Sequence, residues 1–281
     1  MLVLLLAVAI LNVAFEQRPA IPEERPMSSE EVLKAIRQHD WGIVTRAFTA
    51  SPSIVDEIGR ALPQLDNEAR EIAIATIEHN SWPNSGQLLL RMTGDQTLQV
   101  AAGAARALSK TNDVPPINDI LAAIPQREND FVRGRLYLLA GRTNDANKLE
   151  ALRGLAAKEK NPDVAFDAEV ATVKLGGEPE RAKFLERVRS AKPDQATRIT
   201  DYLRYLVDPR LAKGMISWLS NNAPVFRLGT DRDPRMARMC DLAVYTAHQL
   251  GVEFYLEPER MANFEASIIA NAGAALKALP D

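Results

Sequence analysis

Apolar residues recur at three- and four-residue spacing along most of the chain. That spacing is typical of amphipathic helices that bury one side. Segments in which apolar and polar residues alternate, as they do in half-buried strands, are nearly absent, and residues 252–256 form the one candidate. The pattern therefore predicts an all-α fold, with apolar helical stripes at residues 54–65, 117–124, 149–155 and 199–206.

The predicted helices come in pairs that repeat along the chain. Successive first helices begin roughly 27 to 35 residues apart, a period typical of helical repeat proteins, near Ile54, Leu88, Ile117, Leu149, Phe184 and Leu211. The second helices follow Asx or Asx-Pro signals and are predicted at residues 66–77, 95–108, 129–140, 161–175, 194–206 and 233–250.

Local signals mark both ends of the second helices. Asn161 can cap exposed N–H groups, and Pro162 fits the first helical turn. Four glycines fall just after the last apolar position of a helix, where a left-handed residue normally ends it: Gly94, Gly141, Gly176 and Gly251.

Small residues in the middle of the second helices allow neighbouring helices to approach closely. The same spacing of apolar and small residues occurs in two of them, Val164-Ala168-Ala171-Leu175 and Met239-Ala243-Thr246-Leu250. A lone helix pair cannot bury its apolar stripe, so each pair is expected to stack on the next and to build a continuous core.

A loose motif recurs near the second helices, in which Asp or Asn precedes Pro, Val or Arg. It is carried by Asp95 with Val100 and Ala104, Asp130-Phe131-Val132-Arg133, Asn161-Pro162-Asp163-Val164, Asp208-Pro209-Arg210 and Asp233-Pro234-Arg235. Over about residues 53 to 251 the pattern resembles the HEAT-repeat family, including its shorter HEAT-like variety. The resemblance implies a right-handed α-solenoid of about six stacked antiparallel helix pairs.

The N-terminal part of the chain has a different composition. Residues 1–15 are apolar, and the first charged residue is Glu16. Because this segment is too short to span about 30 Å of hydrocarbon, we interpret it as a hydrophobic export signal or a short membrane anchor. The alternative is a buried first helix of a cytosolic protein. Residues 16–27 hold three prolines and several charges, which predicts an extended spacer.

A single solenoid domain is expected over residues 28–281. Two atypical helices are predicted to cap it, one at residues 29–48 and one at residues 258–279. Ser28 and Glu31 have the spacing of a capping box, which would open the first of them.

Composition and charge exclude several classes of protein. The chain has 281 residues, 46% of them hydrophobic, a formal net charge of −3 and a pI near 5.8. These values indicate a folded core and argue against a protein that grips nucleic acid through a basic face. The one cysteine, Cys240, excludes an internal disulfide framework and a thiolate metal cluster, and its apolar neighbours predict a buried small side chain.

No constellation of residues predicts catalysis, a cofactor or a metal site. The three histidines, His39, His79 and His248, lie in different units. Glu78-His79 occurs once, in the reverse of the order found in HEAT-like di-iron hydroxylases. His79 is therefore predicted only to end its helix, where a cation is tolerated.

Arginines on the second helices are the candidate partner-binding residues. In solenoids of this type the second helices line the concave surface, so contact with a partner is predicted for Arg106, Arg133, Arg135 and Arg238. Arg227 and Arg232 lie in an irregular, charged loop at residues 227–233, which is a second candidate contact. Two alternatives stay open: Asp-to-Arg pairs that bridge adjacent repeats, for Arg70 and Arg133, and a tolerated insertion, for the loop.

The function that these features favour is a non-catalytic protein–protein interaction scaffold. We expect a monomer, periplasmic or otherwise extracytoplasmic, that presents a concave surface to a protein or peptide and not to nucleic acid. The alternatives are a HEAT-like enzyme of the lyase or DNA-glycosylase type and a purely structural spacer.

Overall fold

The computed structural model of the chain describes residues 27–38, 40–50, 54–80, 85–228, 235–256 and 262–280. These residues are mostly helical, as the apolar spacing predicts. The predicted export segment or anchor and nearly all of the Pro-rich spacer lie outside the described residues. In the part that is described, no helix combines the length and the apolar character needed to span a membrane.

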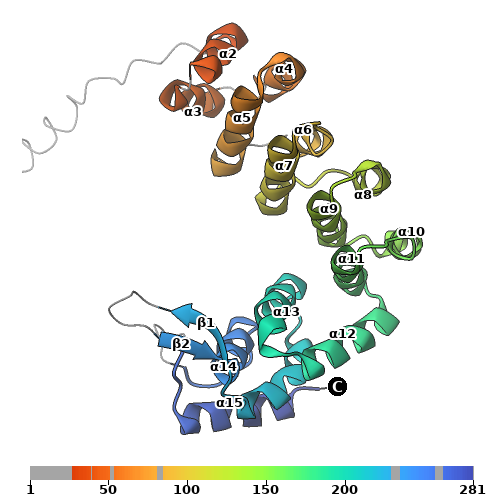
Figure 1. Cartoon of the computed structure of the whole chain (residues 1–281), viewed down its shortest axis with the longest axis vertical. Coiled ribbons are helices and arrows are strands. Elements are labelled where there is room, and N and C mark those ends of the chain that lie inside the picture. Colours follow the sequence, from red (N-terminus) through yellow and green to blue (C-terminus); the bar gives the residue numbers. More distant parts are fainter. Residues whose placement is uncertain are drawn as a thin grey trace, which may run out of the picture.

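Helix pairs follow one another from α4 to α13. Figure 1 shows the first helix of each pair along the outer side of an arc and the second helix along the inner side. The outer helices are α4 (Ile54–Ala61), α6 (Gly86–Met92), α8 (Ile117–Ala123), α10 (Leu149–Ala156) and α12 (Glu178–Ser190). The inner helices are α5 (Asn67–Asn80), α7 (Leu98–Lys110), α9 (Asp130–Arg142), α11 (Pro162–Lys174) and α13 (Pro193–Leu206).

Asx side chains cap α5, α9 and α11, as predicted, whereas α7 and α13 begin after Thr97 and Lys192 instead. The Asn161 side chain accepts hydrogen bonds from the backbone N–H groups of Asp163 and Val164, at 2.8 and 3.3 Å. Asn129 caps α9 in the same way, through the N–H of Val132 at 3.1 Å. Each cap satisfies donors that the first helical turn leaves without partners.

Only two of the four predicted glycine stops adopt the left-handed conformation. Gly176 and Gly251 have φ values of 97° and 81°. The prediction is wrong for Gly141, which lies inside α9, and Asn144 takes the left-handed position beyond that helix with φ of 53°. Gly94 does follow the end of α6 at Met92, as predicted, but it has no positive φ.

The apolar stripes form large clusters that meet at α11. One cluster extends from Val32 to Leu175, and a second extends from Val170 to Leu276. Helix α11 contributes Val164 and Ala171 to the first cluster and Val170 and Val173 to the second. The same helix therefore packs on its neighbours from both directions along the chain, as expected for stacked pairs.

Small residues bring α9 and α11 close together. A Cβ atom added to Gly141 would lie 3.1 Å from the Ala171 Cα atom and 2.2 Å from the Tyr205 hydroxyl oxygen. The Tyr205 hydroxyl donates a hydrogen bond of 2.6 Å to the Leu138 carbonyl, which links α13 to α9 across α11. The interface has no room for a larger residue at position 141.

The N-terminal capping region differs from its prediction. Instead of one helix at residues 29–48, two helices are present, α2 (Ser29–Arg37) and α3 (Trp41–Ala50). The predicted capping box opens α2, with Ser28 and Glu31 each bonding the backbone of the other. Asp40 caps α3 by accepting from the Ile43 N–H at 3.1 Å, which interrupts the predicted helix.

The C-terminal region contains a β-hairpin that the sequence pattern does not predict. Strands β1 (Pro224–Leu228) and β2 (Arg235–Arg238) pair antiparallel, with Arg227 opposite Met236. Residues 252–256, the predicted strand candidate, form no strand. The helix predicted at residues 233–250 is shorter, α14 (Met239–Gln249), because the Asp241 carboxylate accepts from the Arg238 N–H at 2.9 Å and sets its start.

The remaining elements complete this region. The helix predicted near Leu211 is a 3-10 helix, η4 (Pro209–Ser220), and the short 3-10 turns η1 (Leu62–Gln64), η2 (Ile124–Gln126) and η3 (Ala146–Lys148) flank earlier helices. The C-terminal cap, predicted at residues 258–279, begins later, as α15 (Ala266–Ala278). Residues 257–261 lie outside the described residues.

Two glycine variants test the packing of α9 on α11. We expect Gly141→Ala to lower the free energy of unfolding by about 1–3 kcal/mol, because its methyl group would overpack the interface. Gly154→Ala is the matched control, since nothing lies within 4 Å of a Cβ atom at that position in α10. It should raise the free energy by roughly 0.5–1 kcal/mol, and urea unfolding followed by circular dichroism measures both. Equal effects of the two changes would argue against close α9–α11 packing.

Candidate functional site

Arg106, on the inner helix α7, is largely exposed. Its side chain is 59% exposed, and its Nε atom donates to Glu78 Oε2 on α5 at 3.3 Å. Lys110 pairs with the same carboxylate. Burial alone would raise the pKa of Glu78, but its contacts with Lys110 and Arg106 outweigh burial and lower that pKa. Lys110 and Arg106 share the Glu78 carboxylate, and only the Nε of Arg106 is bonded to it. The other N–H groups of Arg106 therefore stay available to another acceptor.

Arg135 and Phe131 form an exposed pair on α9. The guanidinium carbon of Arg135 lies 5.1 Å from the centre of the Phe131 ring, within the range of a cation–π contact. Phe131 is 45% exposed. The two side chains together offer a partner an apolar surface beside a positive charge.

Arg133, in contrast, uses all of its donors inside the chain. Nε and Nη2 each donate to the Glu159 carboxylate at 3.0 Å, and Nη2 also donates to Asp130. Nη1 donates to the backbone carbonyls of Arg127 and Glu128, at 3.1 and 2.7 Å. A guanidinium has five N–H donors, so none is left for a partner.

Arg238 likewise holds the C-terminal region together. It forms two hydrogen bonds to Asp241, of 2.9 and 2.7 Å, and one of 3.0 Å to the Phe264 carbonyl. Asp241 is fully buried and also accepts from the Phe264 N–H at 3.1 Å. Burial would raise the pKa of Asp241, but its bonds with Arg238 and the backbone lower it. Arg238 therefore anchors residues 262–264 to α14.

The predicted binding loop is partly a strand. Arg227 lies on β1 and is exposed, whereas Arg232 lies outside the described residues. Partner binding by either arginine stays a prediction.

Ion pairs bridge successive units, as the alternative interpretation of Arg70 and Arg133 proposes. Arg70 Nε lies 3.3 Å from Asp95 Oδ2, and Arg133 pairs with Glu159. Further pairs between units are Arg153–Glu180, Arg181–Asp208 and Arg198–Asp163. These contacts fix the position of each unit relative to the next, and most leave the arginine partly exposed.

An aromatic and charged cluster joins α11, α12 and α13. The Phe166 ring lies 4.8 Å from the Arg187 guanidinium carbon and 5.4 Å from that of Arg198. The Tyr202 hydroxyl donates to Asp167, and burial raises the pKa of that carboxyl despite this bond. Sequence reasoning does not find this cluster, because its residues come from three helices and follow no short motif.

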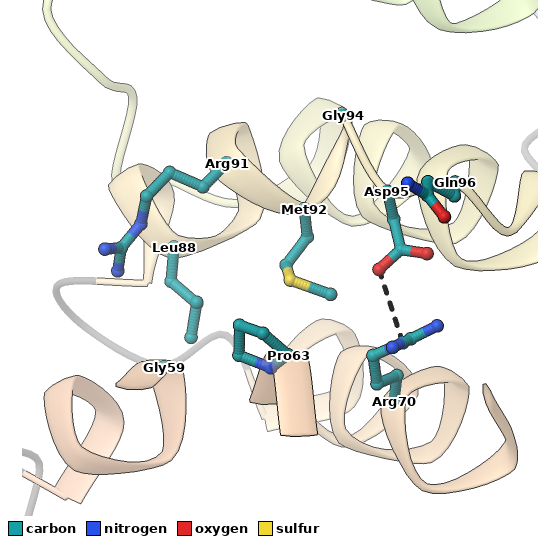
Figure 2. Close-up of a pocket in the computed structure, with 9 residues that line it drawn as sticks. All are labelled: Gly59, Pro63, Arg70, Leu88, Arg91, Met92, Gly94, Asp95 and Gln96. Carbon is teal, nitrogen blue, oxygen red and sulfur yellow. Dashed lines mark ion pairs between the residues drawn. The ribbon is translucent and has the colours of Figure 1, made fainter. Parts of the chain in front are cut away.

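Cavities open between successive units. Figure 2 shows one of about 460 Å³ between the α4–α5 and α6–α7 pairs, where Leu88, Met92 and Pro63 form apolar walls and the Arg70–Asp95 pair lies at one end. A cavity of about 430 Å³ adjoins Phe166 and holds two arginines and two aspartates. A third, of about 310 Å³, lies between the α8–α9 and α10–α11 pairs.

The remaining candidate chemical groups lie apart. His79 is exposed in the last turn of α5, as predicted, and His248 stacks edge-on against Phe254. Cys240 is buried, as predicted, and burial raises the pKa of its thiol. His39 lies outside the described residues. Within the described ranges, no group of three His, Cys, Asp or Glu side chains is placed to hold a metal ion.

The Arg133–Glu159 pair gives a pH-dependent prediction. Burial would raise the pKa of Glu159, but the Arg133 hydrogen bonds outweigh burial and hold that pKa below its ordinary value. The lowered pKa stabilises the native chain fully at pH values above about 4.3, the pKa of Glu159 in the unfolded chain. This stabilisation is lost as the pH falls through the lower pKa that Glu159 has in the native chain. Arg133→Met leaves Glu159, only 7% exposed, without its partner.

We expect Arg133→Met to lower the free energy of unfolding by about 2–4 kcal/mol at pH 7, because an unpaired carboxylate stays buried. The difference from the natural chain should shrink on going from pH 7 to about pH 3, because Glu159 in the variant becomes protonated and no longer leaves a buried charge without a partner. Urea unfolding at the two pH values measures this. A difference that does not change with pH would mean that Arg133 acts through its backbone contacts alone.

Comparison with known proteins does not assign the chain to a family. No protein family model, no curated protein and no solved structure matches the chain. The HEAT-like resemblance therefore stays a prediction.

Proposed function

We propose that the chain is a right-handed, HEAT-like α-solenoid that acts as a non-catalytic protein-interaction scaffold. The observation that carries the proposal is the double row of helices along an arc, with α5, α7, α9, α11 and α13 on its inner side (Figure 1). Stacked helix pairs of this kind present an extended, largely pre-formed surface to a partner.

The exposed residues of the inner helices support a protein or peptide as the partner. Arg106, Arg135 and Phe131 are of residue types enriched at protein interfaces, where arginine supplies directed hydrogen bonds and phenylalanine supplies apolar area. Arg133 and Arg238 have their donors engaged within the chain, so we assign them to the folded structure and not to the contact surface.

The N-terminal segment supports a location outside the cytoplasm. Residues 1–15 are apolar, and the Pro-rich residues 16–27 would separate the folded part from a membrane. In this proposal the chain is exported or tethered and acts as a monomer.

A charge-reversal experiment tests the contact surface. The double variant Arg106→Glu/Arg135→Glu should lose a partner that the natural full-length chain recovers from cell extracts, with recovery falling by about tenfold or more. The matched control is Arg91→Glu/Arg189→Glu, which reverses two exposed arginines on the outer helices α6 and α12. Quantitative mass spectrometry of the recovered proteins measures the difference.

The control should recover the partner as the natural chain does. Equal recovery by the inner-helix variant would contradict the proposed surface and favour the structural spacer, whose role depends on length and not on charge.

A further inference from the structure

The cavity of about 310 Å³ between the α8–α9 and α10–α11 pairs is strongly basic. Arg127, Arg133, Lys158 and Lys160 line it, and Glu159 is its one carboxylate. Arg133 already neutralises Glu159 through two hydrogen bonds of 3.0 Å. Three cations are therefore left without compensation, in a chain whose formal net charge is −3.

Other cavities between units are closer to balance. The cavity beside Phe166 is lined by Arg187 and Arg198 and also by Asp163 and Asp194. The one shown in Figure 2 has Arg70 and Arg91 against Asp95. Among these three the excess of positive charge is particular to the cavity of α9 and α10, and Arg127 also lines a fourth cavity, of about 340 Å³, together with Asp95 and Glu128.

Arg127 is held in place by neutral groups. Its Nε donates to Thr93 Oγ1 at 3.0 Å and its Nη2 to the Leu90 carbonyl at 3.5 Å, and it makes no ion pair with any described residue. Burial lowers its pKa, as expected for a cation without a counter-ion. A Cβ atom at Gly94 would lie 2.9 Å from Arg127 Nη1, so the glycine at that position makes room for the guanidinium.

Tyr137 adds a hydroxyl donor without a partner. The residue is only 2% exposed, lines the cavity, and makes no hydrogen bond with the described residues. Burial raises its pKa to about 12, so the hydroxyl keeps its proton at neutral pH. The hydroxyl oxygen itself keeps contact with solvent, so it is open to donate to an acceptor bound in the cavity.

We propose that this cavity binds a phosphate monoester group. A dianion with several acceptor oxygens matches three uncompensated cations and a hydroxyl donor, whereas a single carboxylate would match fewer of them. The cavity is at the lower end of the size range of ligand sites, which suits one phosphorylated group. This site is separate from Arg106, Arg135 and Phe131 and does not depend on the proposed scaffold function.

Titration of the full-length chain with inorganic phosphate, followed by calorimetry, tests the site. Lys158→Gln/Lys160→Gln should weaken binding by about tenfold or more, because two charge-assisted contacts are lost. Both lysines are exposed, so folding should be unaffected. The matched control, Lys34→Gln/Lys277→Gln, removes two exposed lysines far along the chain from the cavity and should bind as the natural chain does.

Tyr137→Phe separates a binding role from a structural one. It should weaken phosphate binding several-fold while leaving the urea midpoint unchanged or higher, because the hydroxyl that it removes has no partner in the structure. A loss of stability with unchanged phosphate affinity would contradict the proposed role of the hydroxyl.

A second set of titrations identifies the source of the group. A phosphoserine peptide that binds, and is released by phosphatase treatment, would assign the site to a phosphorylated side chain, whereas binding of phosphate without the peptide would assign it to a small phosphorylated molecule. The proposal is overturned if neither binds, if the lysine variant binds phosphate as the natural chain does, or if the unphosphorylated peptide binds equally well.

Discussion

The structure depends on one constraint: a short amphipathic helix pair cannot bury its apolar stripe by itself. Each pair must therefore cover its stripe with the next pair along the chain. Helix α11 shows this directly, because it contributes Val164 and Ala171 to the cluster that precedes it and Val170 and Val173 to the one that follows. The arc in Figure 1, the ion pairs between units and the cavities between them all follow from that stacking.

The stacking also determines which charged side chains remain available to a partner. Arginine and carboxylate side chains face each other where the N-terminus of an inner helix meets the turn of the following unit. Arg133 is one of these arginines, and it donates hydrogen bonds to the Arg127 and Glu128 carbonyls as well as to Glu159. Among the described residues Arg106 pairs only with Glu78, and Arg135 lies over Phe131, so both remain exposed.

The same argument explains the basic cavity. Arg133 neutralises the one carboxylate there, and it also fixes the backbone at residues 127–128 that carries Arg127. Arg127, Lys158, Lys160 and Tyr137 line a common cavity. A side chain that organises the fold can therefore create an anion-binding site without contacting the anion strongly itself. The proposed contact surface of the inner helices and the proposed phosphate site use different residues, so the two proposals are independent of each other.

The amino-acid sequence by itself determined the helical class, the helix pairs and the Asx caps of α5, α9 and α11, because helical periodicity and capping depend on residues only three or four positions apart. It did not predict the β1–β2 hairpin, since strand pairing depends on a partner segment and not on local spacing. The glycines show the same limit: Gly141 lies inside α9, where it makes room for Tyr205, and Gly94, which does follow α6, also makes room for Arg127. Only the tertiary structure decided which arginines are engaged and which are exposed, because that depends on carboxylates about one repeat away in the chain.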